Sequence, residues 1–238
     1  MERHVLNLSK ELIKRGHEVD VYTCNGMRNG EALEAFSLVD GIPVYRFRSV
    51  ANIGEFGKVW PGFVVRLLST GYDVIHAHAY RHPHTDLSLA VSKLSRCQSV
   101  LTAHSPFHPA YVRTALARAL VPIYDGLLAR FALRAFDRIV SLTNSEAEVL
   151  LSFGARRQQV VVIPHGVQQF HFSRVDPSAF IAKYGLQGKK IILYLGRINR
   201  TKGLNVLVQA FARIASIYPH TALVLVGPCS SVEEQAYR

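Results

Sequence analysis

Apolar residues along this chain follow two patterns that alternate from one end to the other. Short continuous apolar runs predict strands buried in a parallel sheet, and apolar residues at helical spacing predict the connecting helices. The predicted strands are residues 17–23, 42–47, 73–78, 99–102, 137–143, 160–163, 191–195 and 221–226. The predicted helices are residues 1–15, 60–69, 87–94, 111–135 (with a break near Pro122) and 204–217. Such alternation indicates an α/β fold.

Turn-forming residues separate the predicted elements. Asn25-Gly26, Asn29-Gly30 and Asp40-Gly41 favour tight turns. Residues 52–58, which include two glycines, are expected to form a flexible loop. Residues 144–146 predict the cap that begins a short helix. The first helix is expected to bury the face that carries Val5, Leu8, Leu12 and Ile13.

Composition places the chain among globular proteins. Its 238 residues are 49% hydrophobic, which excludes a disordered chain. No apolar run is long enough to span a bilayer, and no secretory leader is visible. The three cysteines are widely spaced, which argues against a disulfide framework or a cysteine zinc site. We therefore expect a cytoplasmic protein.

The formal net charge of +11 suits three kinds of partner: nucleic acid, an anionic membrane surface, or acidic substrates. The basic residues are scattered, and no nucleic-acid motif is present, so nucleic acid is disfavoured. The helical region 111–135 and its flank carry recurring arginines, which allows two interpretations: solvated domain helices, or peripheral contact with an anionic cytoplasmic membrane. These arginines are Arg113, Arg118, Arg130, Arg134 and Arg138.

The segment 193–203, LYLGRINRTKG, places two cations where a predicted strand ends and a helix is about to begin. Arg197 follows Gly196, and Lys202 precedes Gly203. Cations beside a helix amino end suit an anion such as a diphosphate, and glycine allows the backbone to approach it. The alternative is a solvated loop with two ordinary surface cations.

The pattern G-R-x-x-x-x-K-G after an apolar strand is similar to the donor-diphosphate motif of the retaining glycosyltransferases of family 4, which have the GT-B fold. The resemblance implies two Rossmann-like domains that hold a nucleotide-diphosphate sugar between them. It implies that Arg197 and Lys202 bind the diphosphate, in a loop shaped by Gly196 and Gly203. No Asp-x-Asp metal motif is present, so no metal or other cofactor is expected.

The strand at 73–78 ends in His76-Ala77-His78 and runs into a loop with His82 and His84. Four histidines in nine residues raise the alternative of a zinc site, but no acidic or cysteine ligand is close in sequence. Strand parity places His76 and His78 on the same side. Because D-V-I-H-A-H is similar to the family's H-x-H strand end, the resemblance implies that both histidines line the cleft. A polar strand end is the alternative.

Two further histidines stand at family-like positions. T-x-H-S-P-F at 102–107 resembles the loop whose histidine lies close to the transferred sugar, which implies this role for His104. A histidine that caps the following loop is the alternative, and His108 is a weaker candidate. Residues 164–167 read P-H-G-V where the family commonly has P-N-G-V. His165 and Gly166 are therefore expected at the cleft, with His165 in place of the usual asparagine.

The resemblance also predicts the domain organisation. The motif E-R-H-V-x-x-L at 2–8 is similar to the family's first helix, which the family places after a strand and a Gly-Gly loop. We therefore expect residues 1–170 to form an acceptor-side domain that lacks its first strand, residues 171–188 to connect, and residues 189–238 to begin the nucleotide-sugar domain. The family's paired-glutamate motif has no match in the sequence.

The function implied by the resemblance is retaining transfer of a sugar from a nucleotide-diphosphate sugar to a glycan or lipid-phosphate acceptor. No convincing nucleophile is present, which fits attack from the leaving-group face. The alternative is a truncated, non-catalytic remnant or nucleotide-binding module of the same fold. Because a sheet without its central strand exposes apolar edges, the isolated chain is expected to be inactive and aggregation-prone.

Overall fold

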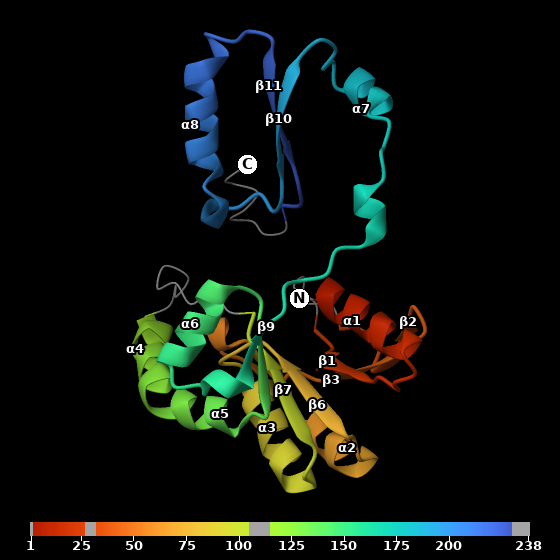
Figure 1. Ribbon diagram of the computed structural model, residues 1–238, viewed down its shortest axis with the longest axis vertical. Helices are drawn as coiled ribbons and strands as arrows, with labels where there is room; N and C mark the ends of the chain where they lie inside the picture. Colours follow the sequence, from red (N-terminus) through yellow and green to blue (C-terminus); the bar gives the residue numbers. More distant parts are fainter. Residues whose placement is uncertain (1, 27–31, 105–114, 230–238) are drawn as a thin grey trace. The chain divides into compact units, whose positions relative to one another are not determined.

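A computed structural model of the chain describes residues 2–26, 32–104 and 115–229. The chain divides into two compact units, Met1–Val167 and Gln168–Arg238 (Figure 1). Each unit is described by itself. Among the described residues, no helix has the length and apolar character needed to cross a bilayer. The predicted connection at 171–188 stays a prediction.

The first unit is built on a parallel four-stranded sheet whose spatial order follows the chain (Figure 1). Its strands are β6 (Val74–His78), β7 (Gln98–Thr102), β8 (Arg138–Ser141) and β9 (Val160–Val162). The connections carry α3 (Pro83–Ser95), α4 (Ala115–Ile123), the π-helix η3 (Tyr124–Leu128), α5 (Ala129–Ala135), α6 (Asn144–Ser152) and η4 (Arg157–Gln159). The predicted alternation of strands and helices is confirmed.

A second sheet holds β1 (Val21–Cys24), β3 (Ile42–Phe47) and β2 (Phe36–Val39) in that order. β1 pairs with β3 in parallel, and β2 with β3 as an antiparallel hairpin closed at Asp40-Gly41. β1 begins later than predicted, because residues 17–20 precede the ladder. β2 was not predicted. In the described part of the chain β1 and β6 belong to separate sheets, although a doubly wound domain has one.

The region predicted as a flexible loop has regular structure. β4 (Ala51–Asn52) and β5 (Lys58–Val59) pair antiparallel around the 3₁₀ turn η1 (Gly54–Phe56). The prediction was wrong because the glycines, Gly54 and Gly57, take positive φ angles and shape a tight hairpin instead of loosening the chain.

Two apolar clusters form the core of the first unit. One lies between the four-stranded sheet and its helices, with Leu101, Leu133, Ile139 and Leu150 almost fully buried. The other centres on α2 (Phe63–Thr70) and Trp60, and joins both sheets. α1 (Glu2–Lys14) buries Ser9 and half-buries Val5, Leu8 and Leu12. Ile13, predicted on the same buried face, is exposed, because it stands at the edge of that face.

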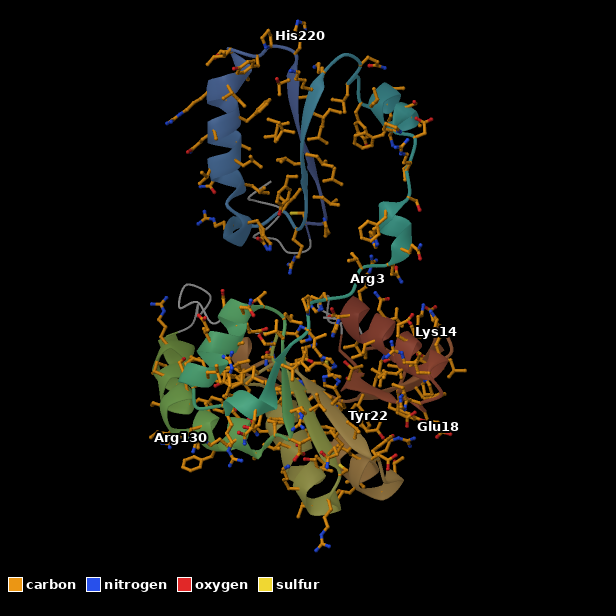
Figure 2. The ribbon with its side chains drawn as sticks, viewed as in Figure 1. Arg3, Lys14, Glu18, Tyr22, Arg130 and His220 are labelled. Carbon is orange, nitrogen blue, oxygen red and sulfur yellow. The ribbon has the colours of Figure 1, made fainter. Side chains whose placement is uncertain are left out.

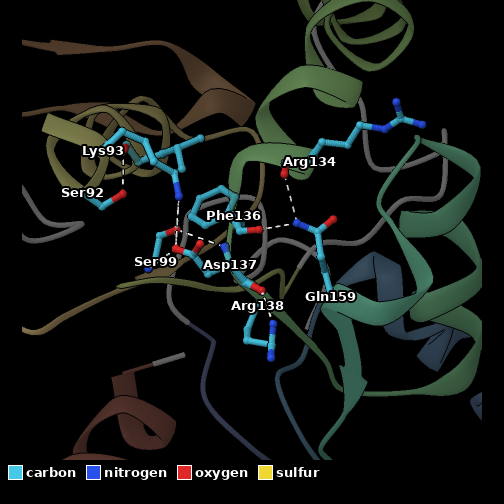
Figure 3. Close-up of polar contacts among 9 residues, drawn as sticks. Ser92, Lys93, Ser99, Arg134, Phe136, Asp137, Arg138 and Gln159 are labelled. Carbon is cyan, nitrogen blue, oxygen red and sulfur yellow. Dashed lines mark hydrogen bonds and ion pairs between the residues drawn. The ribbon is translucent and has the colours of Figure 1, made fainter. Parts of the chain in front are cut away.

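Two polar side chains tie the strands together beneath this core (Figure 3). Asp137 accepts from the backbone N–H of Ser99 at 2.8 Å and from its hydroxyl at 2.6 Å, and Lys93 lies 3.1 Å away. Gln159 is buried and donates to the carbonyls of Arg134, at 3.0 Å, and Phe136. These bonds fix the start of β8 against β7 and β9, because buried polar groups must find partners.

The long helical segment after residue 115 does not break at Pro122. Pro122 lies inside α4, and the π-helix η3 follows directly. Proline lacks an N–H and crowds the preceding turn, and the wider π turn takes up the change in hydrogen-bond pattern. Arg113 lies outside the described residues. Arg118, Arg130, Arg134 and Arg138 are exposed, as the solvated-helix interpretation predicted.

The start of α6 is capped one residue earlier than predicted. The Thr143 side chain accepts from the Glu146 backbone N–H at 3.1 Å, so Thr143, and not Asn144, is the cap. The Glu146 carboxylate in turn accepts from the backbone of Leu142 at 2.5 Å. This exchange is a capping box shifted by one position, and such caps are worth about 1 kcal/mol.

The second unit contains a two-stranded parallel sheet of β10 (Lys190–Leu195) and β11 (Thr221–Val226), linked by α8 (Leu204–Ala215). η5 (Gln169–Phe172), α7 (Ser178–Lys183) and η6 (Arg200–Lys202) complete its described elements. β10 was predicted as a buried strand, but it is mostly exposed, with Leu195 at 75%. The reason is that β11 is its one strand partner among the described residues.

Candidate active site

Histidines gather at one edge of the four-stranded sheet. β6 ends at His78, β7 is followed two residues later by His104, and β9 is followed by His165. The carboxyl ends of parallel strands meet at the same edge, which is where open α/β sheets bind ligands. The first turn of α1 adds His4. We call His4, His76, His78, His104 and His165 the histidine cluster.

The rings of the histidine cluster are in direct contact. His78 Nδ1 lies 3.1 Å from His104 Nε2, and His4 Nδ1 lies 2.9 Å from His165 Nδ1. Ring centroids are 4.3 Å apart for His76 and His78, and 5.3 Å apart for His4 and His104 and for His104 and His165. The cluster is therefore one continuous group of imidazoles drawn from four distant parts of the chain.

Strand parity separates the histidines from the core. Ile75 and Ala77 are buried in the apolar clusters, and the alternate positions His76 and His78 are half-buried on the other side. His76 Nε2 is 2.8 Å from the hydroxyl of the fully buried Thr102 on β7. The prediction that His76 and His78 share a side is confirmed.

The backbone that presents the cluster is held in an uncommon conformation. Ala79, Arg81 and His104 have positive φ angles of 82°, 65° and 48°. Left-handed conformations in non-glycine residues cost about 1–3 kcal/mol and persist where the surroundings enforce them. Here the backbone N–H of Ala79 donates to Thr102 O at 3.0 Å, and that of Tyr80 donates to Ala103 O at 2.8 Å.

A largely buried ion pair holds the loop that follows His78. Arg81 donates to both carboxylate oxygens of Asp125, at 2.8 and 2.5 Å, and each side chain is 12% exposed. The Tyr80 hydroxyl donates to Asp125 Oδ1 at 2.9 Å. A bidentate pair fixes both partners in one geometry. The π-helix η3, which carries Asp125, therefore acts as a support for the loop beside the histidine cluster.

Burial keeps four rings of the histidine cluster, those of His4, His76, His78 and His104, neutral at pH 7. It lowers the pKa of His76 and His104 to about 4 and that of His78 to about 2, with further lowering from neighbouring imidazoles. Burial and the nearby His165 also lower the pKa of His4. A neutral imidazole has one donor and one acceptor nitrogen, so these rings can bind hydroxyl groups or donate a lone pair to a metal.

The histidines that are adjacent in sequence do not form a site together. His82 Nδ1 lies 2.9 Å from the carbonyl of Tyr80, and His84 Nε2 lies 2.8 Å from the carbonyl of His78. The His84 ring stacks on Trp60 at 5.1 Å. Both residues therefore support the loop. Among the described residues, the ring nitrogens of the histidines in 76–84 do not come close enough to one another to bind one zinc ion, as that alternative requires.

The second unit contains the loop predicted to bind the donor diphosphate, residues 196–203, which we call the donor loop. Gly196 follows β10, Arg197 is half-buried, and Lys202 is exposed in the 3₁₀ turn before α8. Gly203 has φ +67°, a left-handed conformation that lets the chain turn directly into the helix. The structure thus confirms the strand, loop and helix arrangement around Arg197 and Lys202, while their role stays a prediction.

The donor loop is bound tightly to the end of β11. The N–H of Gly196 donates to Val226 O at 2.9 Å, and that of Ile198 donates to Pro228 O at 3.1 Å. A Cβ atom on Gly227 would lie 1.7 Å from the carbonyl oxygen of Gly196. An open pocket adjoins this contact, lined by Ile198, Leu204, Asn205, Val208, Gln209, Leu225 and Gly227. Sequence reasoning did not single out Gly227.

Sequence reasoning singled out four of the five members of the histidine cluster and missed the fifth, His4. His78 and His104 are in contact as expected, and His165 joins them. His4 was quoted within a motif and given no site role, although that motif was the one signal for it. Gly166 is exposed, and an added Cβ would meet no atom within 4 Å, so its glycine is not required by packing. His108 lies outside the described residues.

Comparison with known families covers most of the chain. Residues 1–169 match the family model of Glycosyltransferase Family 4. Residues 176–238 match the family model of Glycosyl transferases group 1. The first match covers the unit that carries the histidine cluster, and the second covers the unit that carries the donor loop.

Curated relatives are similar along nearly the whole chain. A phosphatidyl-myo-inositol mannosyltransferase of Mycobacterium tuberculosis is 28% identical over an alignment of 231 positions that covers 95% of this chain and 56% of that protein. A D-inositol 3-phosphate glycosyltransferase of Nocardia farcinica is 27% identical over a gapped alignment of 249 positions that covers 97% of this chain and 54% of that protein. The chain therefore spans about half the length of the curated relatives it matches.

Two solved structures show a similar fold. Sucrose-phosphate synthase from Thermosynechococcus elongatus superposes with a TM-score of 0.66 at 23% identity, over 95% of this chain and 56% of that one. The HepE protein of Anabaena, solved in complex with UDP, superposes with a TM-score of 0.61 at 19% identity. The match covers 83% of this chain and 50% of that one. The predicted GT-B class, with Rossmann-like parallel sheets, is confirmed.

Proposed function

Because the chain belongs to Glycosyltransferase Family 4, we propose that the protein carrying it transfers a sugar from a nucleotide-diphosphate sugar to an acceptor with retention of anomeric configuration. The donor loop carries this proposal: Arg197 and Lys202 flank a turn that ends at the amino end of α8. A HepE structure of similar fold holds UDP, which supports a nucleoside diphosphate as the leaving group.

The two cations act on the leaving group. Negative charge grows on the diphosphate as its bond to the sugar breaks, so fixed positive charge there stabilises the transition state more than the bound donor. The amino end of α8 adds a partial positive charge through the helix dipole. These groups balance the leaving-group charge, and the reaction proposed for this loop requires no metal ion or other cofactor.

His104 acts on the sugar in this proposal. It is half-buried at the strand-end edge, and its lowered pKa keeps it neutral at pH 7. A neutral imidazole can donate to one sugar oxygen and accept from a hydroxyl. His76, His78, His165 and Gly166 line the same edge as cleft residues.

A lipid-phosphate or glycan acceptor at a membrane surface suits the first unit. Along α4, η3 and α5 the side chains of Leu120, Ile123, Leu127 and Phe131 are 40–74% exposed at helical spacing. Arginines flank them, and Figure 2 shows Arg130 at the outer edge of this unit. Exposed apolar and basic side chains on one helical segment favour peripheral binding to anionic lipid. Relatives named for phosphatidylinositol acceptors support this choice.

Removal of either donor-loop cation is expected to weaken nucleotide binding. In the complete polypeptide that carries this sequence, Arg197→Ala or Lys202→Ala should raise the Kd for UDP about 10- to 100-fold, because a hydrogen bond to a charged group contributes about 1.5–3 kcal/mol. Isothermal titration calorimetry measures this directly. Arg213→Ala, in the last turn of α8, is the matched control for loss of one exposed positive charge. Unchanged affinity in both loop variants would remove the donor-site assignment.

Substitution of His104 is expected to slow transfer while donor binding is retained. His104→Ala should lower kcat about 10- to 100-fold, because a contact made to the reacting sugar is lost. His104→Asn separates the effect of losing the ring from any effect on the backbone, because asparagine tolerates a positive φ. Both variants should be slow and should bind UDP normally, and His17→Ala, at an exposed histidine of the same unit, should be unaffected. A protein that binds donor but never turns over would instead favour the nucleotide-binding module.

A further inference from the structure

We infer that His4, His78 and His104 form a binding site for a divalent transition-metal ion of the Zn²⁺ class. Each residue offers one ring nitrogen, and the three nitrogens all lie within 4.8 Å of one another. They come from α1, the end of β6 and the loop after β7, so the site exists only in the folded first unit. This site differs from the zinc site considered in the sequence analysis, which was formed by the histidines of residues 76–84.

The spacing suits imidazole ligation. Zinc binds histidine nitrogen at about 2.0–2.1 Å, so two nitrogens of a tetrahedral site stand about 3.3 Å apart. His78 Nδ1 and His104 Nε2 are already 3.1 Å apart, close to this separation. The third nitrogen, from His4, must approach by a small side-chain rotation, and α1 places its ring beside both, with centroids 5.8 and 5.3 Å away.

The protonation state suits a metal as well. Ligation requires an imidazole nitrogen whose lone pair is free to face the metal. The 3.1 Å contact between His78 and His104 requires a hydrogen on one of the two facing nitrogens. When an ion enters, that hydrogen moves to the other nitrogen of its own ring, so both lone pairs face the metal without net proton release.

His165 and His76 support the ligands. His165 lies 2.9 Å from His4, and His76 stacks on His78 at 4.3 Å while its Nε2 contacts the hydroxyl of Thr102. Groups that orient a ligating histidine raise its affinity for metal. Because three protein nitrogens leave one tetrahedral position open, a water or a substrate oxygen can occupy the fourth.

The site is separable from transfer activity. The proposed transfer requires no metal, and an ion held by His104 would compete with the sugar for the same ring, so Zn²⁺ is expected to inhibit. That consequence rests on the proposed function, whereas metal binding itself does not. Binding is therefore tested first and without any assay of transfer.

The experiment uses the complete polypeptide that carries this sequence, prepared without a histidine tag and stripped with a chelator. Co²⁺ is titrated while the visible absorption is recorded, and Zn²⁺ is then added to displace it. A single ion per chain with an intense, tetrahedral-type Co²⁺ spectrum is expected. His4→Gln and His104→Gln should each weaken binding about tenfold or more and change the spectrum, since each removes a ligand.

Controls decide between this site and other histidines. His17→Gln, at an exposed position in the same unit, should bind Co²⁺ as the parent does. Circular dichroism establishes that each variant is folded, and a Zn²⁺-induced rise in Tm in the parent that is lost in His4→Gln provides a second readout. Equal binding by the parent and both ligand variants, or no binding by the parent, would overturn the inference.

Discussion

Replacement of Asp125 with asparagine is expected to lower the free energy of unfolding of the first unit by about 3 kcal/mol or more. Asp125 pairs with Arg81 through two hydrogen bonds, and both side chains are 12% exposed. Asparagine keeps the shape but removes the negative charge, so the guanidinium stays buried without a counter-ion. Its amide N–H₂ would also face the N–H groups of Arg81 in place of one oxygen.

The destabilisation should reach the histidine cluster, because Tyr80 and Arg81 follow His78 directly. Tyr80 loses its charged acceptor, and Arg81 has a positive φ that its surroundings must enforce. We expect weaker Co²⁺ binding by Asp125→Asn even under conditions where the unit remains folded. The double variant Arg81→Met/Asp125→Leu should recover part of the stability, since apolar replacement of a buried pair is often tolerated.

The measurement is equilibrium unfolding in urea, followed by Trp60 fluorescence and circular dichroism. Asp40→Asn is the control, because Asp40 forms an ion pair with Lys10 at 2.7 Å in which the side chains are 54% and 36% exposed. Surface pairs contribute about 0–1 kcal/mol, so this variant should unfold nearly as the parent does. If the two variants lose equal stability, the buried pair does not support the loop as described.

The edge of the sheet that carries the site could be predicted because its signals are local. Continuous apolar runs marked β6 and β7, and parallel topology alone requires their carboxyl ends to meet. His104 stands two residues beyond Thr102, the register partner of His78, and the rings of His78 and His104 are 3.1 Å apart, as that argument requires. Strand parity likewise predicts that His76 and His78 share one side of β6.

The remainder of the cluster could not be derived from local pattern. His4 and His165 meet across 161 positions, and neither apolar spacing nor turn chemistry pairs them. The long-range contact depends on how α1 packs, which a periodicity argument does not determine. The ion pair of Arg81 with Asp125 could not be derived from local pattern either. The two residues are 44 positions apart, and charged residues are expected at the surface.

Burial was the least predictable property. The run at 191–195 is as apolar as the core strands, yet Leu193 is 59% and Leu195 75% exposed. An apolar sequence shows that a strand can be buried, but its actual exposure depends on which other elements pack against it. β2 was missed for the opposite reason: it is short and lies at a sheet edge, with Phe36 and Leu38 exposed, so no buried run marked it.

Replacement of Gly227 with alanine is the second large effect we expect, and it acts on the donor loop without removal of any charged group. An alanine Cβ would lie 1.7 Å from the carbonyl oxygen of Gly196 and 2.6 Å from its carbon. Both atoms belong to backbone, so no side-chain rotation relieves the overlap. The strand ends must separate, which breaks the bonds of Gly196 to Val226 and of Ile198 to Pro228.

Overpacking against a rigid neighbour is expected to cost about 3 kcal/mol or more. Because Arg197 lies between the two displaced residues, its guanidinium moves with them. We therefore expect the Kd for UDP to rise about 100-fold or more in Gly227→Ala, measured by calorimetry on the complete polypeptide. Stability of the second unit should fall in parallel, measured by hydrogen exchange at Gly196 and Ile198.

Gly188→Ala separates this steric effect from the general cost of replacing a glycine. Gly188 has φ +67°, and a Cβ there would meet no atom within 4 Å. Alanine at this position pays only for its left-handed backbone, about 1 kcal/mol, and should leave UDP affinity unchanged. The close approach of Gly227 to Gly196 predicts a wide difference in affinity between these two variants. If both bind UDP as the parent does, the contact between β10 and β11 does not set the position of Arg197, and the donor loop must be held by other groups.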